Sequence, residues 1–191
     1  MATAQEYFQI TFDIYPVAWD ESPFLYRSLN QARKEVALDV NLKAVEEIQP
    51  YNLANKTVLT TSKPFLKIYR VFYWWRGNYK LLLKPFTHNP LPVKFFPLFY
   101  PIAYEPVNST TINLYPEYRP LPSDKIEIHY CPVLTDLNYL AMVDPDLDDI
   151  YKYLVAWKLA QFLAINDAQY HLVEFFRTQY ALERMRLLGV R

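Results

Sequence analysis

The chain has 191 residues, of which 52% are apolar and 17% aromatic, and its 20 Lys and Arg balance its 20 Asp and Glu. This length fits one domain, or one domain with a sub-domain, and the apolar content is sufficient for a core. The sequence has neither an apolar run of about eighteen residues nor a basic segment followed by an apolar one at its N-terminus. We therefore expect a soluble protein made in the cytosol, with no membrane partner.

The glycine and cysteine contents exclude two large classes of site. Only 2 glycines accompany 15 prolines, so no Gly-rich loop can hold a nucleotide phosphate, which excludes the Rossmann and P-loop classes. The single Cys131 excludes an internal disulfide, and the 3 histidines lack metal-ligand spacing, so we expect no metal and no cofactor. The 17 tyrosines suit either a well-packed β core or a surface buried against other chains.

The N-terminal third predicts one strand and one helix. The apolar residues from Phe8 to Ile14 alternate with polar ones, which favours a short strand. Ser22-Pro23 then opens a helix over residues 23–39 with two opposite faces. Its apolar face carries Leu25, Leu29, Ala32 and Val36, and its polar face carries Arg27, Asn30, Arg33, Lys34 and Glu35. The following residues, Val40 to Ile48, fit a helix or a strand and end at Gln49-Pro50.

The middle third, residues 57–132, predicts an antiparallel β sub-domain of about five or six strands. Its β-branched and aromatic segments are bounded by turn residues, and Arg76-Gly77-Asn78 predicts a hairpin. The predicted strands are Val58–Thr60, Phe65–Trp75, Tyr79–Lys84, Ile102–Tyr104, Thr111–Tyr115 and Lys125–Cys131. No internal repeat is visible among them.

Prolines predict an extended loop over residues 85–101. Its side chains are too apolar for free solvent, so we expect the loop to lie on its own domain or in a contact with another subunit or component. The interface residues expected there are Phe86, Leu91, Phe95, Phe96, Phe99 and Tyr100.

The last fifty residues or so predict two long helices folded back on one another. Asp144 is the expected N-cap and Pro145 the first helical residue, and capping explains the acidic cluster there better than a cation site does. The run breaks at Asn166-Asp167, where Asp167 is expected to cap the second helix. That helix carries Val173, Phe176, Tyr180 and Leu187 on one face and ends at Gly189 in a left-handed turn.

These elements together predict an α+β fold. The helical core combines the helix over 23–39 with the antiparallel hairpin over 144–188, and the β sub-domain is inserted between them. We expect the whole chain, residues 1–191, to work as one domain.

Charge is unevenly distributed along the chain. No acidic residue occurs between Glu47 and Glu105, whereas 8 Lys and Arg do. This asymmetry favours a surface for nucleic acid or an acidic partner, although a solvated sheet face explains it as well. The predicted basic surface comprises Lys63, Lys67, Arg70, Arg76, Lys80, Lys84 and Lys94. Both faces of the strand Phe65–Trp75 are mostly apolar, which fits a strand buried on two sides better than a base-stacking platform.

A catalytic site is the weakest of the possible functions. Cys131 and His129 are two residues apart in one predicted strand and so share a face, which makes a nucleophile and base pair conceivable. A buried thiol beside a half-exposed histidine explains both residues more simply. We predict no catalytic residues and no enzyme activity.

The order of these elements resembles the head-to-tail adaptor (connector) proteins of tailed bacteriophages, of the tail tubular protein A type. Three stretches carry the resemblance. They are the helix from Phe24 to Ala37 after the acidic entry Trp19-Asp20-Glu21-Ser22, the strand from Pro64 to Val71, and Ile126 to Pro132 followed by Val143 to Asp149 and the helices carrying Tyr170, Phe176, Tyr180 and Leu182.

The resemblance implies a structural virion protein, made in the host cytoplasm, that forms a ring of about twelve copies at the neck of the particle. Such a ring binds the portal protein and a downstream tail component, and it lines the channel through which packaged DNA passes without sequence-specific binding. Some members dock on the portal through a C-terminal extension, so here the docking residues are expected at the end of the last helix, or else on another surface. These are Arg184, Arg186, Leu187, Leu188, Val190 and Arg191.

Two other functions stay open at this point. One is a nucleic-acid-binding module that uses the basic, aromatic middle third. The other, more remote, is an enzyme that uses Cys131 and His129.

Overall fold

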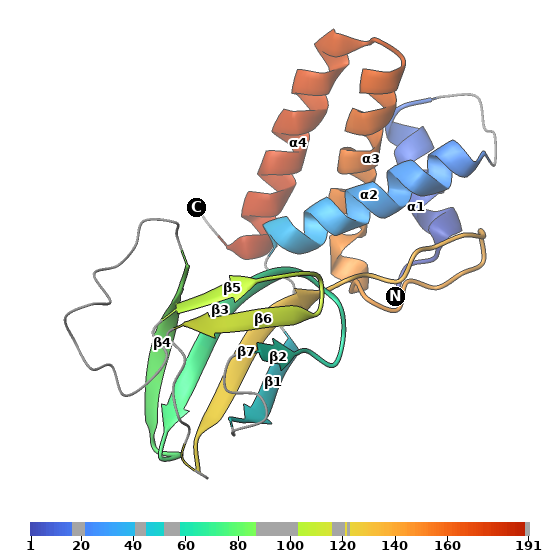
Figure 1. Cartoon of the computed structure of the whole chain (residues 1–191). Coiled ribbons are helices and arrows are strands. Elements are labelled where there is room, and N and C mark those ends of the chain that lie inside the picture. The colour runs from blue at the N-terminus through green and yellow to red at the C-terminus, as the bar shows by residue number, and fades with distance from the viewer. Residues whose placement is uncertain are drawn as a thin grey trace. The chain divides into compact units, whose positions relative to one another are not determined.

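The computed structural model describes residues 1–16, 22–40, 45–51, 58–86, 103–115, 121 and 123–189. It divides the chain into two compact units, which we call the helical unit (Met1–Leu42 with Leu134–Arg191) and the sheet unit (Lys43–Val133). The described residues form four α-helices, one short 3-10 helix and a curled seven-stranded sheet (Figure 1). The predicted α+β class is therefore confirmed.

The first element is a helix, α1 (Ala4–Ile14), so the strand predicted from Phe8 onwards is wrong. Thr3 and Glu6 form a capping box, in which the Thr3 hydroxyl accepts the Glu6 N–H at 3.2 Å and the Glu6 carboxylate accepts the Thr3 N–H at 2.6 Å. Tyr7 and Phe8 are consecutive and both buried. Consecutive side chains of a strand point to opposite faces, so this pair fits the buried face of a helix better than a strand with one buried face. The Thr-x-x-Glu pattern before the apolar residues is the sequence signal that favours the helix over the strand.

Helix α2 (Pro23–Asp39) confirms the predicted helix and its boundaries. The Ser22 hydroxyl accepts a backbone N–H of the first turn at 3.4 Å, and proline occupies the start of the helix. The predicted polar face is wrong for Asn30 and Arg33, because both side chains are buried. Arg33 follows Leu29 by four residues and so lies on the apolar face of the helix.

Arg33 and Asp144 form a buried ion pair in the helical unit. The Arg33 Nε atom donates to Asp144 Oδ2 at 2.7 Å, and Nη1 donates to the Thr135 carbonyl at 2.7 Å. Neither the guanidinium nor the carboxylate side chain has exposed surface. The predicted role of Asp144 as the N-cap of a long helix is wrong, because its Oδ1 accepts the N–H groups of Asp146 and Leu147 in a turn that no helix continues.

The helix predicted from Pro145 begins seven residues later, as α3 (Lys152–Asn166), after a 3-10 turn, η1 (Asp149–Tyr151). Its buried residues include Leu154, Val155, Leu159 and Leu163, and it packs against α1, α2 and α4 (Tyr170–Leu188). No helix in the described part of the chain has the length and apolar character needed to cross a membrane.

Helices α3 and α4 lie side by side (Figure 1), and the Trp157 ring contacts those of Phe175 and Phe176 at centroid distances of 6.3 and 6.2 Å. The predicted buried face of α4 is confirmed for Val173, Phe176 and Tyr180, and Leu187 is half-buried.

The two ends of α4 differ in how well the sequence predicts them. The predicted cap, Asp167, is wrong, because Asp167 accepts the Tyr15 hydroxyl at 2.9 Å and the N-cap residue is Gln169. Gly189 confirms the predicted left-handed end, with φ of 66° and its N–H bonded to the Met185 carbonyl.

The sheet unit contains one sheet with the strand order β1-β7-β3-β4-β5-β6-β2. Most neighbours are antiparallel, but β4 and β5 pair in parallel, so the prediction of a purely antiparallel sub-domain is wrong. The undecided segment after α2 supplies the seventh strand, β1. The strands are β1 (Val45–Pro50), β2 (Val58–Thr60), β3 (Phe65–Trp75), β4 (Tyr79–Pro85), β5 (Ala103–Pro106), β6 (Thr111–Tyr115) and β7 (Lys125–Pro132).

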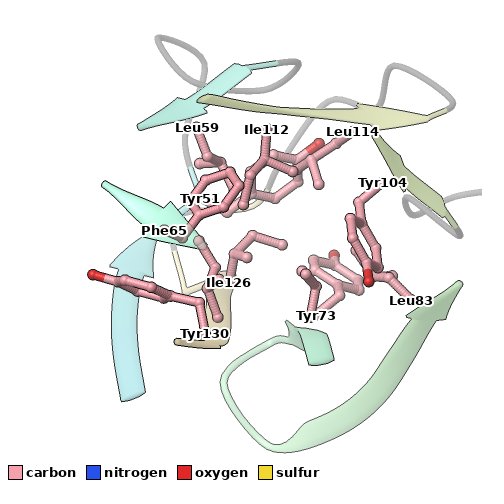
Figure 2. Packing of buried hydrophobic residues seen from close by; sticks show 12 residues of the cluster. Tyr51, Leu59, Phe65, Tyr73, Leu83, Tyr104, Ile112, Leu114, Ile126 and Tyr130 are labelled. Carbon is pink, nitrogen blue, oxygen red and sulfur yellow. The ribbon is translucent and has the colours of Figure 1, made fainter. Parts of the chain in front are cut away.

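Alternate residues of these strands enclose an aromatic and aliphatic core (Figure 2). Tyr51 and Tyr73 meet edge to face at 5.8 Å, and Phe65 meets Tyr130 in the same way at 6.1 Å. The many tyrosines thus include several that fill a β core, one of the two roles that the composition predicts.

Side chains link the two edge strands of the curled sheet. The Gln49 amide donates to the Thr60 carbonyl at 2.7 Å, and the Glu47 carboxylate accepts the N–H and the hydroxyl of Ser62, each at 2.9 Å. Burial alone would raise the pKa of Glu47, but these bonds and the hydroxyl of Tyr130 hold the pKa below its ordinary value. The ionised carboxylate therefore helps to hold the sheet in its curl.

Candidate functional site

Three neighbouring strands, β7, β3 and β4, carry an ordered set of side chains on the face of the sheet opposite its core. Directly opposite residues of antiparallel strands share a face. One row contains Lys125, Trp74 and Lys80. The next contains Glu127, Phe72 and Leu82, and His129 and Arg70 begin a third. We call this surface the outer sheet face.

Glu127 is the centre of the outer sheet face and is only 5% exposed. Its carboxylate accepts the Trp74 indole N–H at 2.6 Å and the Lys80 ammonium at 2.7 Å, and it contacts Nε2 of His129. Burial alone would raise the pKa of Glu127, but the bonds from Lys80, His129 and Trp74 hold the pKa below its ordinary value. Glu127 is thus an internal counter-ion that fixes three neighbouring side chains.

The aromatic rings of this face are already in contact with neighbouring side chains. The Lys80 ammonium lies 4.1 Å from the centroid of the Phe72 ring and 5.2 Å from that of Trp74. The His129 ring meets Phe72 edge to face at 5.3 Å. Because a lysine covers both rings, the face is poorly suited to stack nucleobases, in agreement with the expectation from the sequence.

Three other cations of the sheet unit have no carboxylate beside them of the kind that Glu127 provides for Lys80. Arg70, Lys84 and Lys125 are exposed, and among the described residues no carboxylate lies within ion-pair distance of them. Lys84 follows Leu82 by two residues on β4 and so lies on the outer sheet face.

The turn between β3 and β4 presents one more exposed cation. The Arg76 guanidinium lies 4.8 Å from the centroid of Trp75, and the Arg76 backbone has φ of 51°, an uncommon value for a side chain other than glycine. The buried Asp124 holds this turn, since it accepts the Arg76 N–H at 2.8 Å and the Tyr73 hydroxyl at 2.7 Å.

In the helical unit, the solvent side of α4 carries several large apolar side chains among polar ones such as Glu174 and Thr178. Leu182 and Met185 follow Phe175 by seven and ten residues, which places the three on one side of the helix. Phe175 is 50% exposed, Leu182 51% and Met185 44%. Together with the exposed Tyr170 and Leu188, these residues form what we call the α4 outer face.

The helical unit also has a groove of about 900 Å³ between the first turns of α2 and residues 136–139. Four aromatic side chains line it together with polar groups of α2. The aromatic residues are Phe24, Tyr26, Tyr139 and Phe162. Asn30 fixes one wall of the groove, because its side chain bonds both the N–H and the carbonyl of Leu137 at 2.9 Å.

Four of the six residues predicted to dock on a portal, Arg184, Arg186, Leu187 and Leu188, lie in the last two turns of α4. Arg184 donates to the Asp39 carbonyl at 3.0 Å, and Arg186 pairs with Glu183 at 2.6 Å, so each already has a partner within the helical unit. Leu188 is exposed and Leu187 half-buried. The remaining two, Val190 and Arg191, lie outside the described residues.

The predicted interface loop lies almost entirely outside the described residues. Phe86, its first residue, is half-buried and stacks on Tyr115 at 4.7 Å, which places it in the sheet unit's own packing. The other predicted residues, Leu91, Phe95, Phe96, Phe99 and Tyr100, are not among those described.

The predicted basic surface is not one continuous patch. Arg70, Lys80 and Lys84 lie on the outer sheet face, where Lys80 is neutralised by Glu127, and Arg76 lies in the adjoining turn. Lys63 precedes β3 and Lys67 lies within it, both exposed, and Lys94 is outside the described residues.

Cys131 and His129 have separate partners in the structure. The Cys131 thiol is buried and lies 3.6 Å from the Pro132 carbonyl. The described partners of His129 are the carboxylates of Glu127 and Glu46 and the Phe72 ring. Among the described residues, no group of three or more Cys, His, Asp and Glu is arranged to hold a metal ion.

Sequence reasoning missed Glu127 and Lys125. The alternation of polar and apolar residues from Lys125 to His129 was the available signal, because it places Lys125, Glu127 and His129 on one face of the predicted strand. What the pattern cannot give is the strand order, in which β3 brings Trp74 and β4 brings Lys80 to Glu127. A scan of family models and a search of curated proteins found no match to this chain.

Proposed function

We propose that this chain is a structural, non-enzymatic subunit of a homo-oligomeric ring that joins the portal to the tail of a bacteriophage particle. In this proposal the segments 23–39 and 144–188 form a single helical scaffold that includes an α3–α4 hairpin. DNA passes through the lumen, and the portal and the next tail component bind the two ends of the ring. The resemblance of the sequence to head-to-tail adaptors suggests this role.

The α4 outer face is the observation that carries the proposal. Phe175, Leu182 and Met185 are 50%, 51% and 44% exposed, and large exposed apolar side chains that lie close together often mark interaction sites. The side of α4 that carries Val173, Phe176 and Tyr180 is buried within the helical unit. In this proposal a second protein surface covers the apolar residues of the other side.

A closed ring requires two different surfaces on each subunit, since each copy contacts its two neighbours head to tail. The aromatic groove of the helical unit is a candidate for the second surface, because Phe24 is 39% and Tyr139 57% exposed. In the proposed ring the α4 outer face of one copy covers the groove of the next. Neither surface needs catalytic chemistry.

The mass of the assembled protein tests this proposal directly. Native mass spectrometry of the purified chain, alone and with portal protein, is expected to show a ring of about twelve copies, at least when the portal is present. A variant with Leu182→Glu and Met185→Glu places charge on the α4 outer face and is expected to abolish the ring. Gln5→Glu on the exposed side of α1 is the control and should assemble as the parent does.

A protein that stays monomeric with and without portal contradicts the ring. If that monomer binds DNA in a salt-sensitive manner, the alternative of a nucleic-acid-binding module is favoured instead.

A further inference from the structure

The rows of the outer sheet face continue onto β1, the edge strand beside β7. Ile48 of β1 lies opposite Glu127, Glu127 lies opposite Phe72, and Phe72 lies opposite Leu82. These four residues cross four strands, and we call them the middle row. Ile48 and Leu82 are each 59% exposed, whereas the Glu127 carboxylate is buried and bound to Lys80. The middle row therefore presents apolar side chains to solvent at both of its ends.

Cations flank the middle row on both sides. Lys125 lies two residues from the row on β7, and Arg70 and Lys84 lie two residues from it in the other direction, on β3 and β4. Two residues of a strand correspond to about 7 Å. All three cations are exposed, and the exposed carboxylate of these rows, Glu46, faces His129 at 3.8 Å. The outer sheet face thus has an apolar middle row and a positive rim.

The apolar residues restrict the kind of partner that this face can bind. A phosphate backbone contacts Lys and Arg side chains but leaves Ile48 and Leu82 in contact with water. A protein surface with apolar side chains between carboxylates covers both groups, because protein interfaces combine an apolar centre with a polar, charged rim. The outer sheet face therefore fits an acidic protein surface that has an apolar centre.

The helical unit of the chain has such a surface around η1, which we call the η1 surface. Val143 is 49% exposed, Ile150 59% and Tyr153 46%. Ile150 belongs to η1, and Tyr153 belongs to the first turn of α3. Val143 forms an isolated β-bridge with Thr3, which brings the start of α1 to the same place. Three separate segments of the helical unit thus contribute to the η1 surface.

Carboxylates accompany these apolar side chains. Asp148 is exposed, and among the described residues no cation lies within ion-pair distance of it. Asp149 pairs with Lys152 at 3.2 Å. The bonds from Thr3 lower the pKa of Glu6, and the charges of Asp149 and Lys152 are near enough to act on that pKa as well. With three carboxylates and one lysine, the η1 surface has an apolar centre and a negative rim.

The same contrast holds for the two units as a whole. The sheet unit has 11 Lys and Arg against 6 Asp and Glu, and the helical unit has 9 against 14. Opposite charges of this kind steer two protein surfaces together and suppress the pairing of like surfaces. Because every copy has one surface of each sign, the surfaces can join copies head to tail.

We propose that the outer sheet face of one copy binds the η1 surface of another copy. The middle row packs against the apolar centre of the η1 surface, and Arg70, Lys84 and Lys125 face its carboxylates. The contact is sensitive to salt. It does not rest on the proposed function, because an open chain of copies satisfies it as well as a ring does, and neither surface includes the α4 outer face or the groove.

The test is sedimentation velocity of the full chain at about 20 mM and about 500 mM salt, where charges are screened over roughly 20 Å and 4 Å. At the lower salt the parent is expected to associate, and at the higher salt this association should weaken by about tenfold or more. Two variants each reverse one rim. They are the sheet variant, Arg70→Glu with Lys125→Glu, and the η1 variant, Asp148→Lys with Asp149→Lys. Each alone should weaken association at the lower salt by roughly a hundredfold, because like charges then meet.

Mixing the two variants in equal amounts distinguishes contact between copies from contact within one chain. The acidic face of the sheet variant can bind the basic surface of the η1 variant, and the two unchanged surfaces can bind each other. The mixture should therefore regain most of the association that each variant lost. The control, Lys63→Glu with Arg177→Glu, reverses two exposed cations outside both surfaces and should associate as the parent does. Thermal unfolding should show that every variant is folded.

The variant Leu182→Glu with Met185→Glu separates this contact from the proposed ring. It should keep the salt-sensitive association even where it forms no ring with portal. A sheet variant that associates as the parent does, or a mixture no larger than its components, overturns the contact. A parent that stays monomeric at the lower salt also overturns it, and DNA binding by that monomer would assign the cations to nucleic acid. A ring that survives both charge reversals removes this contact and leaves the proposed function intact.

Discussion

Replacing Arg33 by methionine tests whether the buried ion pair holds the helical unit together. In the parent, Arg33 Nε lies 2.7 Å from Asp144 Oδ2, and the side chains of both residues are fully buried. Methionine fills most of the volume of the arginine stem but leaves the Asp144 carboxylate without its cation. Removing one partner of a buried pair costs about 3 to 5 kcal/mol, mostly because the other charge stays buried.

The helical unit, Met1–Leu42 with Leu134–Arg191, has about 100 residues, so a loss of this size shifts its unfolding midpoint strongly. A loss of 3 kcal/mol corresponds to a fall of more than about 10 °C in the unfolding midpoint of a domain of about 100 residues. The guanidinium also bonds the Asn30 side chain at 3.0 Å and the Thr135 carbonyl at 2.7 Å, so the variant releases two further acceptors. The connection between α2 and residues 135–144 is expected to loosen first.

Far-ultraviolet circular dichroism during urea unfolding is the assay, because the described helices all belong to the helical unit. The control is Arg27→Met, which removes an exposed arginine from the same helix and should change stability by less than about 0.5 kcal/mol. Adding Asp144→Asn to Arg33→Met removes both charges, so the double variant should be less destabilised than the sum of the single ones by roughly 1 to 3 kcal/mol. If Arg33→Met proves as mild as Arg27→Met, the reasoning from burial is refuted.

Three other substitutions test separate parts of the fold. Thr3→Ala removes the hydroxyl of the capping box and should cost the helical unit about 1 kcal/mol; an unchanged unfolding midpoint would contradict the cap seen on α1. Asp124→Ala leaves the buried Tyr73 hydroxyl and the Arg76 N–H without their acceptor, so tryptophan fluorescence should report a loss of about 2 to 4 kcal/mol in the sheet unit. Because the folded-state pKa of Glu47 is lowered, its contribution is present above the pKa of the unfolded chain and is lost as the pH falls through the folded value. The fall in midpoint from pH 6 to about pH 3 should therefore be smaller in Glu47→Gln than in the parent, and an equal fall would count against the role of Glu47.

Elements with a local signal are the ones that the sequence predicts well. Ser22 followed by Pro23 marks the start of α2, and Gly189 marks the end of α4 with the left-handed backbone that glycine favours. The hairpin of β3 and β4 is predicted by its turn residues for the same reason, since Gly77 adopts a positive φ of 72°. Signals of this kind involve residues within a few positions of one another.

Features set by distant residues are the ones that sequence patterns miss. Asp144 is a residue type common at N-caps, and it does accept two backbone N–H groups, but no helix begins there. What the sequence does not reveal is its charged partner, because Arg33 lies 111 positions away. The polar face predicted for α2 failed because a charged residue was placed in solvent by default. Arg33 is buried because Asp144 neutralises it.

The sheet gives a second case of the same limit. The segments of β4 and β5 are each predicted as strands, yet their parallel pairing depends on how the chain returns between them. Glu127 likewise follows the alternation of β7 with no sign that Trp74 and Lys80 meet it from the neighbouring strands. The sequence therefore predicts which residue types the candidate site contains, but not which of those side chains contact one another.

Salt separates the two kinds of contact that could join copies of this chain. The α4 outer face carries large apolar side chains, so its burial would be driven by loss of water contact and should persist at high salt. Contacts made by the exposed cations of the outer sheet face would instead weaken as salt rises. An assembly that persists as salt rises would therefore support the proposed burial of the α4 outer face. If the assembly dissociates as salt rises, the cations hold the copies together and the apolar residues of α4 need another partner.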